Sequence, residues 1–376
     1  NADYSADTEL GSLTEDRGVD GFGILVDESR VRLDTQTHSI GLFFSDVFNV
    51  TEQLAVNVSG RYNHVEIEMQ DRGGNPKLTG NHKFDRFNPA AGLTYAFMPE
   101  FNFYGGYSES SRVPTPMELS CADPEDPCKL PNAFIADPPL EQVVAKTWEA
   151  GFRGRFKNIL DGRINWNAGY FNTVNNNDII FQSAGSANSA GYFDNVGKTQ
   201  RQGVELGLST AFFDRWRMSL NYSFIDATFL TPYVSHSPNH PSADASGDIQ
   251  VKQDDRIPGV RNHIVKFTTD VDVLESWTVG MNVFFNGEQF LRGDEANLDT
   301  PLKGYTVVNL HTEYRFNEHF TVFGRLDNLF NVRYNNFGMY GETGEVLDNL
   351  GIKEGSTRFV GVSAPRAGWV GIKLSL

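Results

Sequence analysis

Hydrophobic and polar residues alternate along most of the chain, from about residue 37 to its end. In YTVVNLHTEYRF, Tyr305–Phe316, Val308 and Leu310 fall on one side of an extended chain, and His311 and Glu313 fall on the other. Successive side chains of a β-strand point to opposite faces, so this pattern predicts a strand with one apolar and one polar face. The same pattern recurs in LAVNVSGRY, TWEAGFRGRF, INWNAGY, VELGLSTAF, MSLNYSF, WTVGMNVFF and GWVGIKLSL. The chain is therefore predicted to contain about thirteen or fourteen strands.

The lengths of the predicted strands and connections indicate what kind of sheet they form. Most of the alternating segments have about ten residues or more, whereas ordinary strands have about 5 to 6 and a membrane-crossing strand needs about 9 to 11. Short connections alternate with long ones, which lie near 71–83, 113–142, 176–190, 230–260, 291–303 and 331–364. Short periplasmic turns and long extracellular loops are typical of outer-membrane barrels. We therefore predict an all-β, antiparallel transmembrane barrel whose apolar faces meet lipid and whose polar faces line the lumen.

Composition excludes several other classes of protein. The chain has 376 residues and a formal net charge of -16, which argues against a nucleic-acid-binding protein because such a protein needs a basic surface. It contains no run of eighteen apolar residues, so no transmembrane helix is expected. A membrane barrel remains possible because only alternate residues of its strands need to be apolar.

The sequence predicts neither an enzyme nor a resident metal or cofactor. The acidic segments do not follow the ligand order of a calcium-binding loop, and no nucleophile and base can be paired. His236 and His240, in SHSPNHP, have helical spacing but lie among prolines and serines, so we assign them to a solvated loop rather than to a metal site.

The two cysteines of the chain, Cys121 and Cys128, lie in a loop rich in Pro and Asp. The predicted topology places this loop outside the cell, where the environment is oxidising. We therefore expect a Cys121–Cys128 disulfide that stiffens the loop, worth about 2.5 kcal/mol by the chain-entropy estimate.

Five phrases, in this order along the chain, resemble the C-terminal part of the barrel of TonB-dependent outer-membrane receptors. They are YSESSRVPTPMEL, ADPPLEQVVAKTWEAGFRGRF, NVGKTQRQGVELGL, LDNLFNVRY and GWVGIKLSL. Receptors of this family have a plug domain inside a barrel of twenty-two strands, and the chain has room for neither the plug nor the first strands. The resemblance thus implies the last thirteen or fourteen strands of a larger barrel in residues 37–376, with residues 1–36 as an acidic extracellular loop or incomplete strand. A complete fourteen-stranded porin-like channel is the alternative.

The resemblance also implies a function, a location and partners. The family imports scarce ligands actively across the bacterial outer membrane, with energy from TonB acting on the plug. Haem receptors of the family carry a His between the first two phrases, and residues 113–138 contain none. We therefore expect a ferric siderophore, or another small ligand, as the transported molecule. TonB, outer-membrane lipid and lipopolysaccharide are the other expected partners.

Site residues follow from the resemblance and from position. Glu149 and Glu205 match barrel glutamates that pair with plug arginines in the family, so the same role is expected of them. Aromatic side chains in the long loops or at their ends offer part-apolar surface to a ligand. The expected ligand-binding residues are Tyr192, Phe193, Tyr233, Phe337 and Tyr340.

Overall fold

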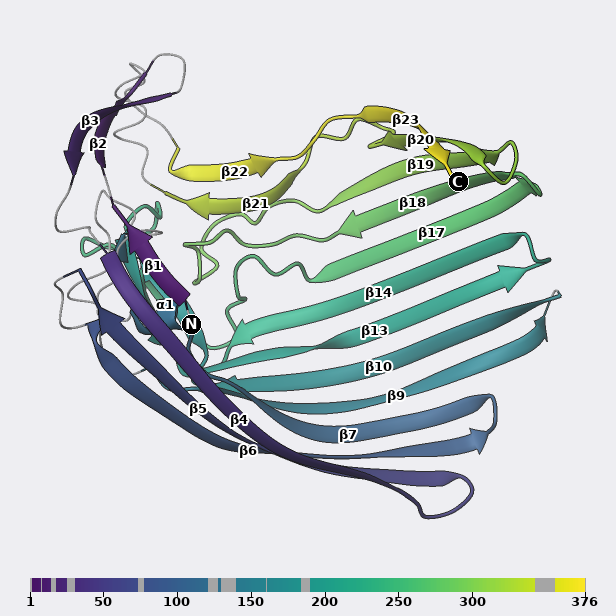
Figure 1. Ribbon diagram of the computed structural model, residues 1–376, viewed down its shortest axis with the longest axis horizontal. Helices are drawn as coiled ribbons and strands as arrows, with labels where there is room; N and C mark the ends of the chain where they lie inside the picture. Colours follow the sequence, from purple (N-terminus) through teal and green to yellow (C-terminus); the bar gives the residue numbers. More distant parts are fainter. Residues whose placement is uncertain are drawn as a thin grey trace.

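The regular secondary structure of the described residues is almost entirely β-strand, and most of the strand residues belong to one sheet. The computed structural model describes residues 2–7, 9–14, 18–25, 31–73, 78–120, 128–129, 140–159, 161–183, 190–341 and 356–375. Fourteen antiparallel strands lie side by side in the main sheet (Figure 1). In order across the sheet they are β1 (Ala2–Ala6), β4 (Val31–Asn49), β5 (Leu54–Asp71), β6 (Gly80–Met98), β7 (Phe101–Arg112), β9 (Val143–Ile159), β10 (Gly162–Asn176), β13 (Lys198–Phe212), β14 (Trp216–Phe229), β17 (His263–Leu274), β18 (Trp277–Asn286), β19 (Tyr305–Arg315), β20 (Phe320–Asp327) and β23 (Ala367–Leu374). The all-β fold class and the strand number agree with the sequence-based prediction.

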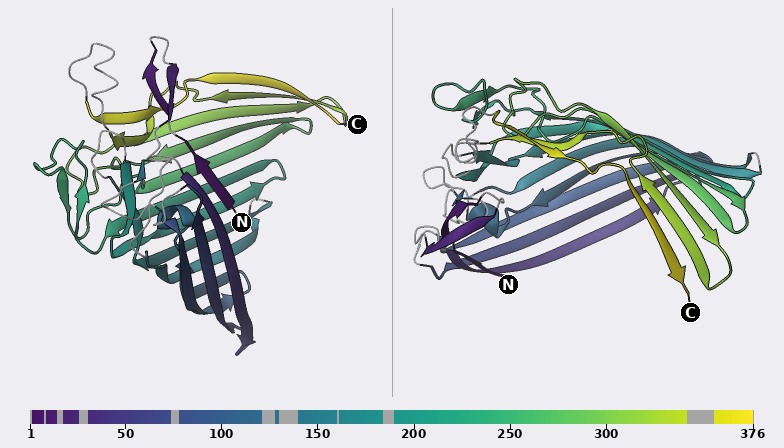
Figure 2. Two further views of the ribbon diagram at one scale, coloured as in Figure 1. Left: turned by 60° about the vertical axis from the view of Figure 1, so that its left-hand side comes forward. Right: turned by 90° about the horizontal axis from the view of Figure 1, so that it is seen from above.

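The sheet is a curved trough with two separate edges (Figures 1 and 2). Among the described strands, β23 pairs with neither β1 nor β4. The short β1 pairs only with residues 31–35 of β4, so the remainder of β4 is paired only with β5. A closed channel of fourteen strands requires its first and last strands to pair. The described strands therefore do not favour the porin-like alternative.

The polar faces of the strands line the inside of the trough. His311 lies on the face of β19 that carries Glu313, and its ring contacts Asp270 of β17 at 2.7 Å. A recess lined by His311, Glu313, Arg325 and Trp369, among others, opens on this face. On the opposite face, large apolar side chains such as Trp148 and Ile372 are 63% and 62% exposed. An exposed apolar outer face and a wet inner face are the pattern of a membrane barrel.

The strands near the N-terminus are much longer than a membrane crossing requires. β4, β5 and β6 have 19, 18 and 19 residues, which at about 3.3 Å per residue corresponds to roughly 60 Å. About 9 to 11 tilted residues suffice to cross a bilayer, so the loop ends of these strands extend beyond it. β4 begins at Val31, within the segment expected to be loop or incomplete strand, and residues 2–6 of that segment form β1.

Additional elements extend the long connections at one end of the sheet, on the left of Figure 1. They are the hairpins β2 (Glu9–Leu13)/β3 (Val19–Leu25), β11 (Ile179–Ser183)/β12 (Ala190–Asn195), β15 (Tyr233–His236)/β16 (Asp248–Val251) and β21 (Asn335–Tyr340)/β22 (Arg358–Val362), with β8 (Cys128–Lys129) and the single turn of α1 (Pro116–Leu119). Thr115 caps α1, because its hydroxyl accepts from the Glu118 amide while the Glu118 carboxylate accepts from the Thr115 amide.

The buried apolar residues gather where these elements pack on the strand ends. One cluster consists of Leu33, Ile67, Met69, Leu78, Leu119 and Leu140. A second consists of Phe229, Ile249, Val251 and Ala296, and a third of Leu291, Leu302 and Tyr340. The loop end thus has cores of its own, so its connections are packed structures that can position side chains.

Candidate functional site

Three connections at the loop end pack into one unit, the loop cap. They are the β14–β17 connection (230–262), the β18–β19 connection (287–304) and the β21–β22 hairpin. The Ser237 hydroxyl donates to the Gly293 carbonyl oxygen at 2.6 Å and joins the first connection to the second. The Arg292 amide donates to the Gly338 carbonyl at 3.1 Å, and the Tyr340 amide donates to the Arg292 carbonyl at 2.8 Å. The β18–β19 connection therefore lies between the other two and is bound to both.

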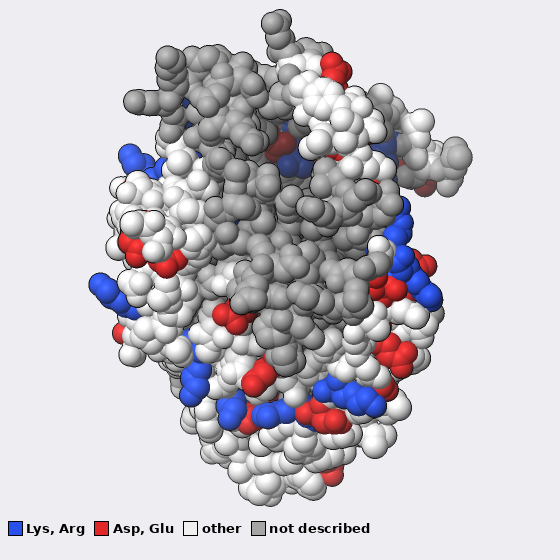
Figure 3. All heavy atoms as spheres, turned by 90° about the vertical axis from the view of Figure 1, so that its left-hand side faces the viewer, with Lys and Arg blue, Asp and Glu red and all other residues white. Residues whose placement is uncertain are grey.

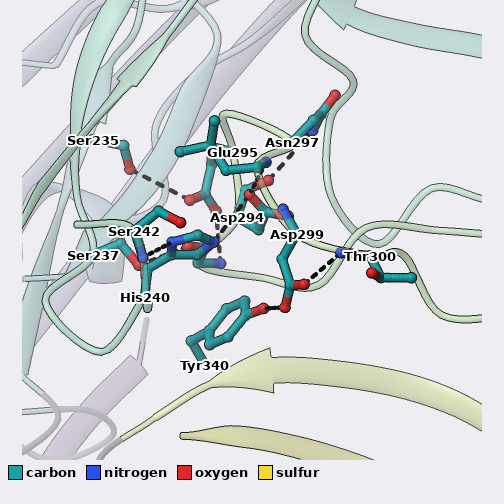
Figure 4. Close-up of polar contacts among 12 residues, drawn as sticks. Ser235, Ser237, His240, Ser242, Asp294, Glu295, Asn297, Asp299, Thr300 and Tyr340 are labelled. Carbon is teal, nitrogen blue, oxygen red and sulfur yellow. Dashed lines mark hydrogen bonds and ion pairs between the residues drawn. The ribbon is translucent and has the colours of Figure 1, made fainter.

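A buried histidine and aspartate lie at the centre of the loop cap (Figure 4). The side chains of His240 and Asp294 are fully buried, with His240 Nε2 3.2 Å from Asp294 Oδ1. The Ser242 amide donates to His240 Nδ1 at 3.0 Å, so Nδ1 is an acceptor and the proton of the neutral ring lies on Nε2, the nitrogen nearer to the carboxylate. Asp294 also accepts from the amides of Leu298 at 2.7 Å and Asp299 at 3.1 Å. One carboxylate thus fixes both its own loop and a histidine of the neighbouring one.

The burial of His240 corrects the interpretation of SHSPNHP as a solvated loop. His240 also packs against Tyr340, with ring centroids 4.7 Å apart. His236 is half-buried, and its Nδ1 lies 2.7 Å from Asp248 Oδ1 across the β15–β16 hairpin. The Pro and Ser residues around the histidines predicted solvation, but the carboxylate of Asp294, distant in sequence, makes a buried position tolerable for His240.

A second carboxylate ties the hairpin to the cap. Asp299 accepts a short hydrogen bond from the Tyr340 hydroxyl and lies 3.2 Å from Arg358 of β22. The hydrogen bond from Tyr340, together with one from the Thr300 amide, lowers the pKa of Asp299 below its usual value. Burial and the same hydrogen bond raise the pKa of the Tyr340 hydroxyl. Tyr340 and Asp299 therefore form a stable phenol–carboxylate pair at neutral pH.

The loop cap is expected to lose stability as pH rises, because it buries carboxyl groups. Burial raises the pKa of Glu295, which accepts from the Gly293 amide at 3.0 Å, and burial also raises the pKa of Asp294. A carboxyl whose folded pKa exceeds its unfolded value contributes stability that is complete below the unfolded pKa and is lost as pH rises through the folded pKa. We expect amide hydrogen exchange of residues 291–299 to report a lower opening free energy at about pH 8 than at about pH 5.

Glu295→Gln should flatten this pH dependence, because a buried neutral amide has no ionisation to suppress. Glu288→Gln is the matched control, since Glu288 belongs to the same connection and its side chain is 49% exposed. An unchanged slope in Glu295→Gln would contradict the assignment. At the acid end, Asp299 acts in the opposite direction, because its stabilising contribution is lost as pH falls through its lowered pKa.

The five expected ligand-binding residues lie in strands at the loop end, but their surroundings differ. Phe193 of β12 packs against the first apolar cluster and Tyr233 of β15 packs against the second. Tyr340 is 7% exposed within the third cluster, whereas Phe337 of the same strand is 42% exposed and Tyr192 is half-buried. A direct role in ligand binding stays a prediction for all five. Packing is the role that the described contacts give to Phe193, Tyr233 and Tyr340.

Glu149 and Glu205 lie on the inner wall of the trough. Glu149 of β9 and Glu205 of β13 are exposed, and neither belongs to an ion pair within the described ranges. Two aspartates of the inner wall are paired, Asp270 with His311 at 2.7 Å and Asp272 with Arg217 at 2.5 Å. Glu149 and Glu205 are thus presented to the lumen without a neutralising partner among the described residues, and their contact with a plug stays a prediction.

Below these carboxylates, toward the short turns, the wall is hollowed. A recess of about 890 Å³ is lined by residues of five strands and the β6–β7 turn. Its polar lining includes Asn102, Tyr104, Arg153, Arg155, Lys157, Asn165, Asn167, Ser209, Ser219 and Asn221. The lumen surface therefore carries cations beneath the carboxylates rather than a single sign of charge.

The predicted disulfide cannot be placed. Cys121 lies outside the described residues, and Cys128 begins the two-residue strand β8, which pairs with β12 through Gly191 and Ala190. The Cys121–Cys128 bond therefore stays a prediction.

The described surface at the loop end mixes charges of both signs. Figure 3 shows Lys and Arg side chains beside Asp and Glu side chains along the described rim. Pairs such as Arg72–Asp34 at 2.7 Å and Lys83–Glu66 at 3.0 Å account for part of this pattern. Within the described ranges, no group of three or more His, Cys, Asp or Glu side chains could hold a metal ion. In the same part of the chain, no helix is long and apolar enough to cross a membrane.

Comparison with known proteins gives one consistent result. A family model described as TonB dependent receptor-like, beta-barrel matches residues 1–329. The chain is similar to a probable TonB-dependent siderophore receptor, PiuA, of Acinetobacter baumannii, with 23% identity over 309 residues, which are 82% of this chain and 38% of the relative. It is similar to the ferric-pyoverdine 358 receptor of Pseudomonas putida, with 22% identity over 83% of this chain and 35% of the relative.

Solved structures support the same fold. The crystal structure of the siderophore receptor PiuA from Acinetobacter baumannii superposes with a TM-score of 0.65 at 17% identity, covering 91% of this chain and 44% of that one. The chain therefore spans less than half the length of these relatives.

Proposed function

Because the chain belongs to the TonB-dependent receptor-like β-barrel family and so to the bacterial outer membrane, we propose that it serves in the active uptake of a ferric siderophore. The observation that carries the proposal is the distribution of side chains on the two faces of the sheet. The inner wall is polar and charged, and the outer face is apolar and exposed. The relatives named as siderophore receptors support the choice of ligand. The absence of a His in residues 113–138 supports a siderophore over haem.

The loop cap supports a receptor rather than an open channel. Its buried His240–Asp294 contact and its hydrogen bonds hold three connections in one arrangement, and a fixed arrangement of loops can present a defined surface to a ligand. In this proposal the contacts to the siderophore come from Phe337, which is exposed, and from Tyr192, which does not belong to the three apolar clusters.

Energy coupling in this proposal passes through a plug domain. Glu149 and Glu205 hold arginines of the plug until TonB pulls on it, and the barrel itself contributes only the wall. The unpaired state of both carboxylates within the described residues supports this role, because an unneutralised pair in a wet lumen is available to a cationic partner.

Membrane contacts follow from the outer face. The apolar band meets lipid, and the charged outer surface above it meets the headgroup region, including lipopolysaccharide. On β5 and β6 this surface carries Tyr62 and His64, both within 2.8 Å of Asp85, and the Lys83–Glu66 pair. Groups that satisfy one another in this way tolerate a polar headgroup region but not the acyl chains.

Uptake of labelled ferric siderophores by cells that express the complete receptor tests the proposal. Accumulation is expected under iron limitation and is expected to stop when an uncoupler dissipates the proton gradient or when TonB is deleted. Vitamin B12 and an oligosaccharide serve as comparison ligands. Accumulation that persists without TonB would support the passive porin-like channel, and accumulation of a comparison ligand alone would replace the siderophore.

A further inference from the structure

Tyr104 of β7 lies flat on two glycines of the inner wall. Register places Tyr104, Gly151, Gly169 and Glu205 in one row across β7, β9, β10 and β13. A Cβ atom at Gly151 or at Gly169 would come within 2.6 Å of the Tyr104 hydroxyl oxygen, closer than real Cβ contacts allow. The phenol therefore reaches across two strands and ends beside the strand that carries Glu205.

A cation holds the ring from the other side. The Arg153 guanidinium carbon is 5.7 Å from the centre of the Tyr104 ring, within the range of a cation–π interaction. Arg153 follows Gly151 at the next inner-face position of β9, so it approaches the ring from the side of the short turns. The glycine floor and this guanidinium together fix the direction in which the hydroxyl points.

Two carboxylates lie on the inner wall near the phenol. Neighbouring strands are about 4.8 Å apart, so a hydroxyl lying over Gly169 is one strand away from Glu205. Glu149 precedes Gly151 at the adjacent inner-face position of β9, and both glutamates are close enough to act electrostatically on Tyr104. Within the described residues, the Tyr104 hydroxyl has no hydrogen-bond partner and neither carboxylate has an ion-pair partner.

We propose that Tyr104 completes, with Glu149 and Glu205, a seat for a guanidinium or ammonium side chain of a domain that lies inside the barrel. This inference rests on the proposed function, in which both glutamates hold the plug, and it adds a positioning residue and a geometry. A guanidinium has five N–H donors in a plane, so it can donate to both carboxylates and to the phenol oxygen together. Gly151 and Gly169 are required because any side chain there would lift the phenol away from the seat.

The seat can be tested on the chain itself, folded in detergent micelles. The probe is N-acetyl-argininamide, followed by saturation-transfer NMR, with uncharged N-acetyl-norleucinamide as the comparison probe. Tyr104→Phe removes only the hydroxyl and is expected to weaken binding of the cationic probe about three- to tenfold, the effect of one hydrogen bond. Gly169→Ala is expected to weaken it similarly, because the added Cβ meets only the movable end of the phenol at short range. Glu205→Gln should weaken it more.

The outcomes separate this inference from the proposed function. Ser108→Ala, an exposed hydroxyl elsewhere on the inner face of β7, is the control, and heat-dependent gel mobility shows that each variant is folded. Loss of binding in Glu205→Gln with wild-type binding in Tyr104→Phe and Gly169→Ala overturns the role of Tyr104 and leaves the carboxylates in place. Wild-type binding in all three variants, equal binding of the uncharged probe, or no binding to the unaltered chain overturns the seat altogether.

Discussion

Asp294→Ala is expected to release the loop cap, lowering its free energy of opening by about 3 to 5 kcal/mol, because three buried groups lose their carboxylate partner at about 1 to 3 kcal/mol each. The substitution leaves the amides of Leu298 and Asp299 without their acceptor and leaves His240 buried without its carboxylate. Amide hydrogen exchange should show faster opening in residues 291–302 and also around His240, although these segments are distant in sequence. Opening confined to the mutated connection would contradict the joint packing of the cap.

Glu288→Ala is the matched control for this prediction. Glu288 belongs to the same connection and forms an ion pair with Arg256 at 3.1 Å, but its side chain is 49% exposed. Exposed pairs of this kind contribute less than about 1 kcal/mol, so exchange in this variant should stay close to that of the unaltered chain. Asp294→Asn should fall between the two, because the amide keeps the shape and one acceptor oxygen.

The strands and their faces could be predicted from the sequence because a single local rule decides them. In YTVVNLHTEYRF, the alternation separates Val308 and Leu310 from His311 and Glu313, and the structure keeps this separation across β19. Alternation with a period of two residues can be recognised without knowledge of distant residues. The predicted number of strands therefore agrees with the fourteen strands of the main sheet. The start of β4 could not be predicted, because the segment 1–36 as a whole has the acidic composition of a loop, and its last residues, 31–36, nevertheless extend β4.

The loop cap could not be predicted in the same way, because its contacts join segments with no common pattern. The neighbouring Pro and Ser residues predict a solvated His240, and the approach of Asp294 from another connection explains its burial. Aromatic residues in loops predict a ligand contact for Tyr340 and Tyr233, which stays a prediction, and the structure adds that each packs in an apolar cluster. Loop composition indicates exposure only when the loops do not pack on one another.

For the inner wall, the sequence predicts which side chains face the lumen but not which of them lie next to one another. Alternation placed Glu149 and Glu205 toward the lumen, and the structure agrees. The floor formed by Gly151 and Gly169 depends on strand register, which a pattern within one strand cannot specify. The contact between Tyr104 and the two glycines can be recognised only when the register of β7, β9 and β10 is known.

Arg261→Ala is expected to loosen the base of the cap by about 3 to 5 kcal/mol, because charge-assisted hydrogen bonds and a cation–π contact are lost together. The buried guanidinium donates to the carbonyls of Gly287 and Asn335 and lies 4.8 Å from the centre of the Tyr305 ring. It thus joins the end of the β14–β17 connection to the other two connections of the cap.

Hydrogen exchange in Arg261→Ala should increase near residues 287 and 335 as well as near 261. Arg261→Lys should restore only part of the protection, because an ammonium group lacks the planar fork that reaches both carbonyls. Faster exchange near residue 261 alone, with residues 287 and 335 as protected as before, would show that the connections are held independently. Siderophore binding measured on the same variants tests whether recognition needs a fixed cap. Loosened loops must be ordered again when the ligand binds, and the cost of that ordering lowers affinity.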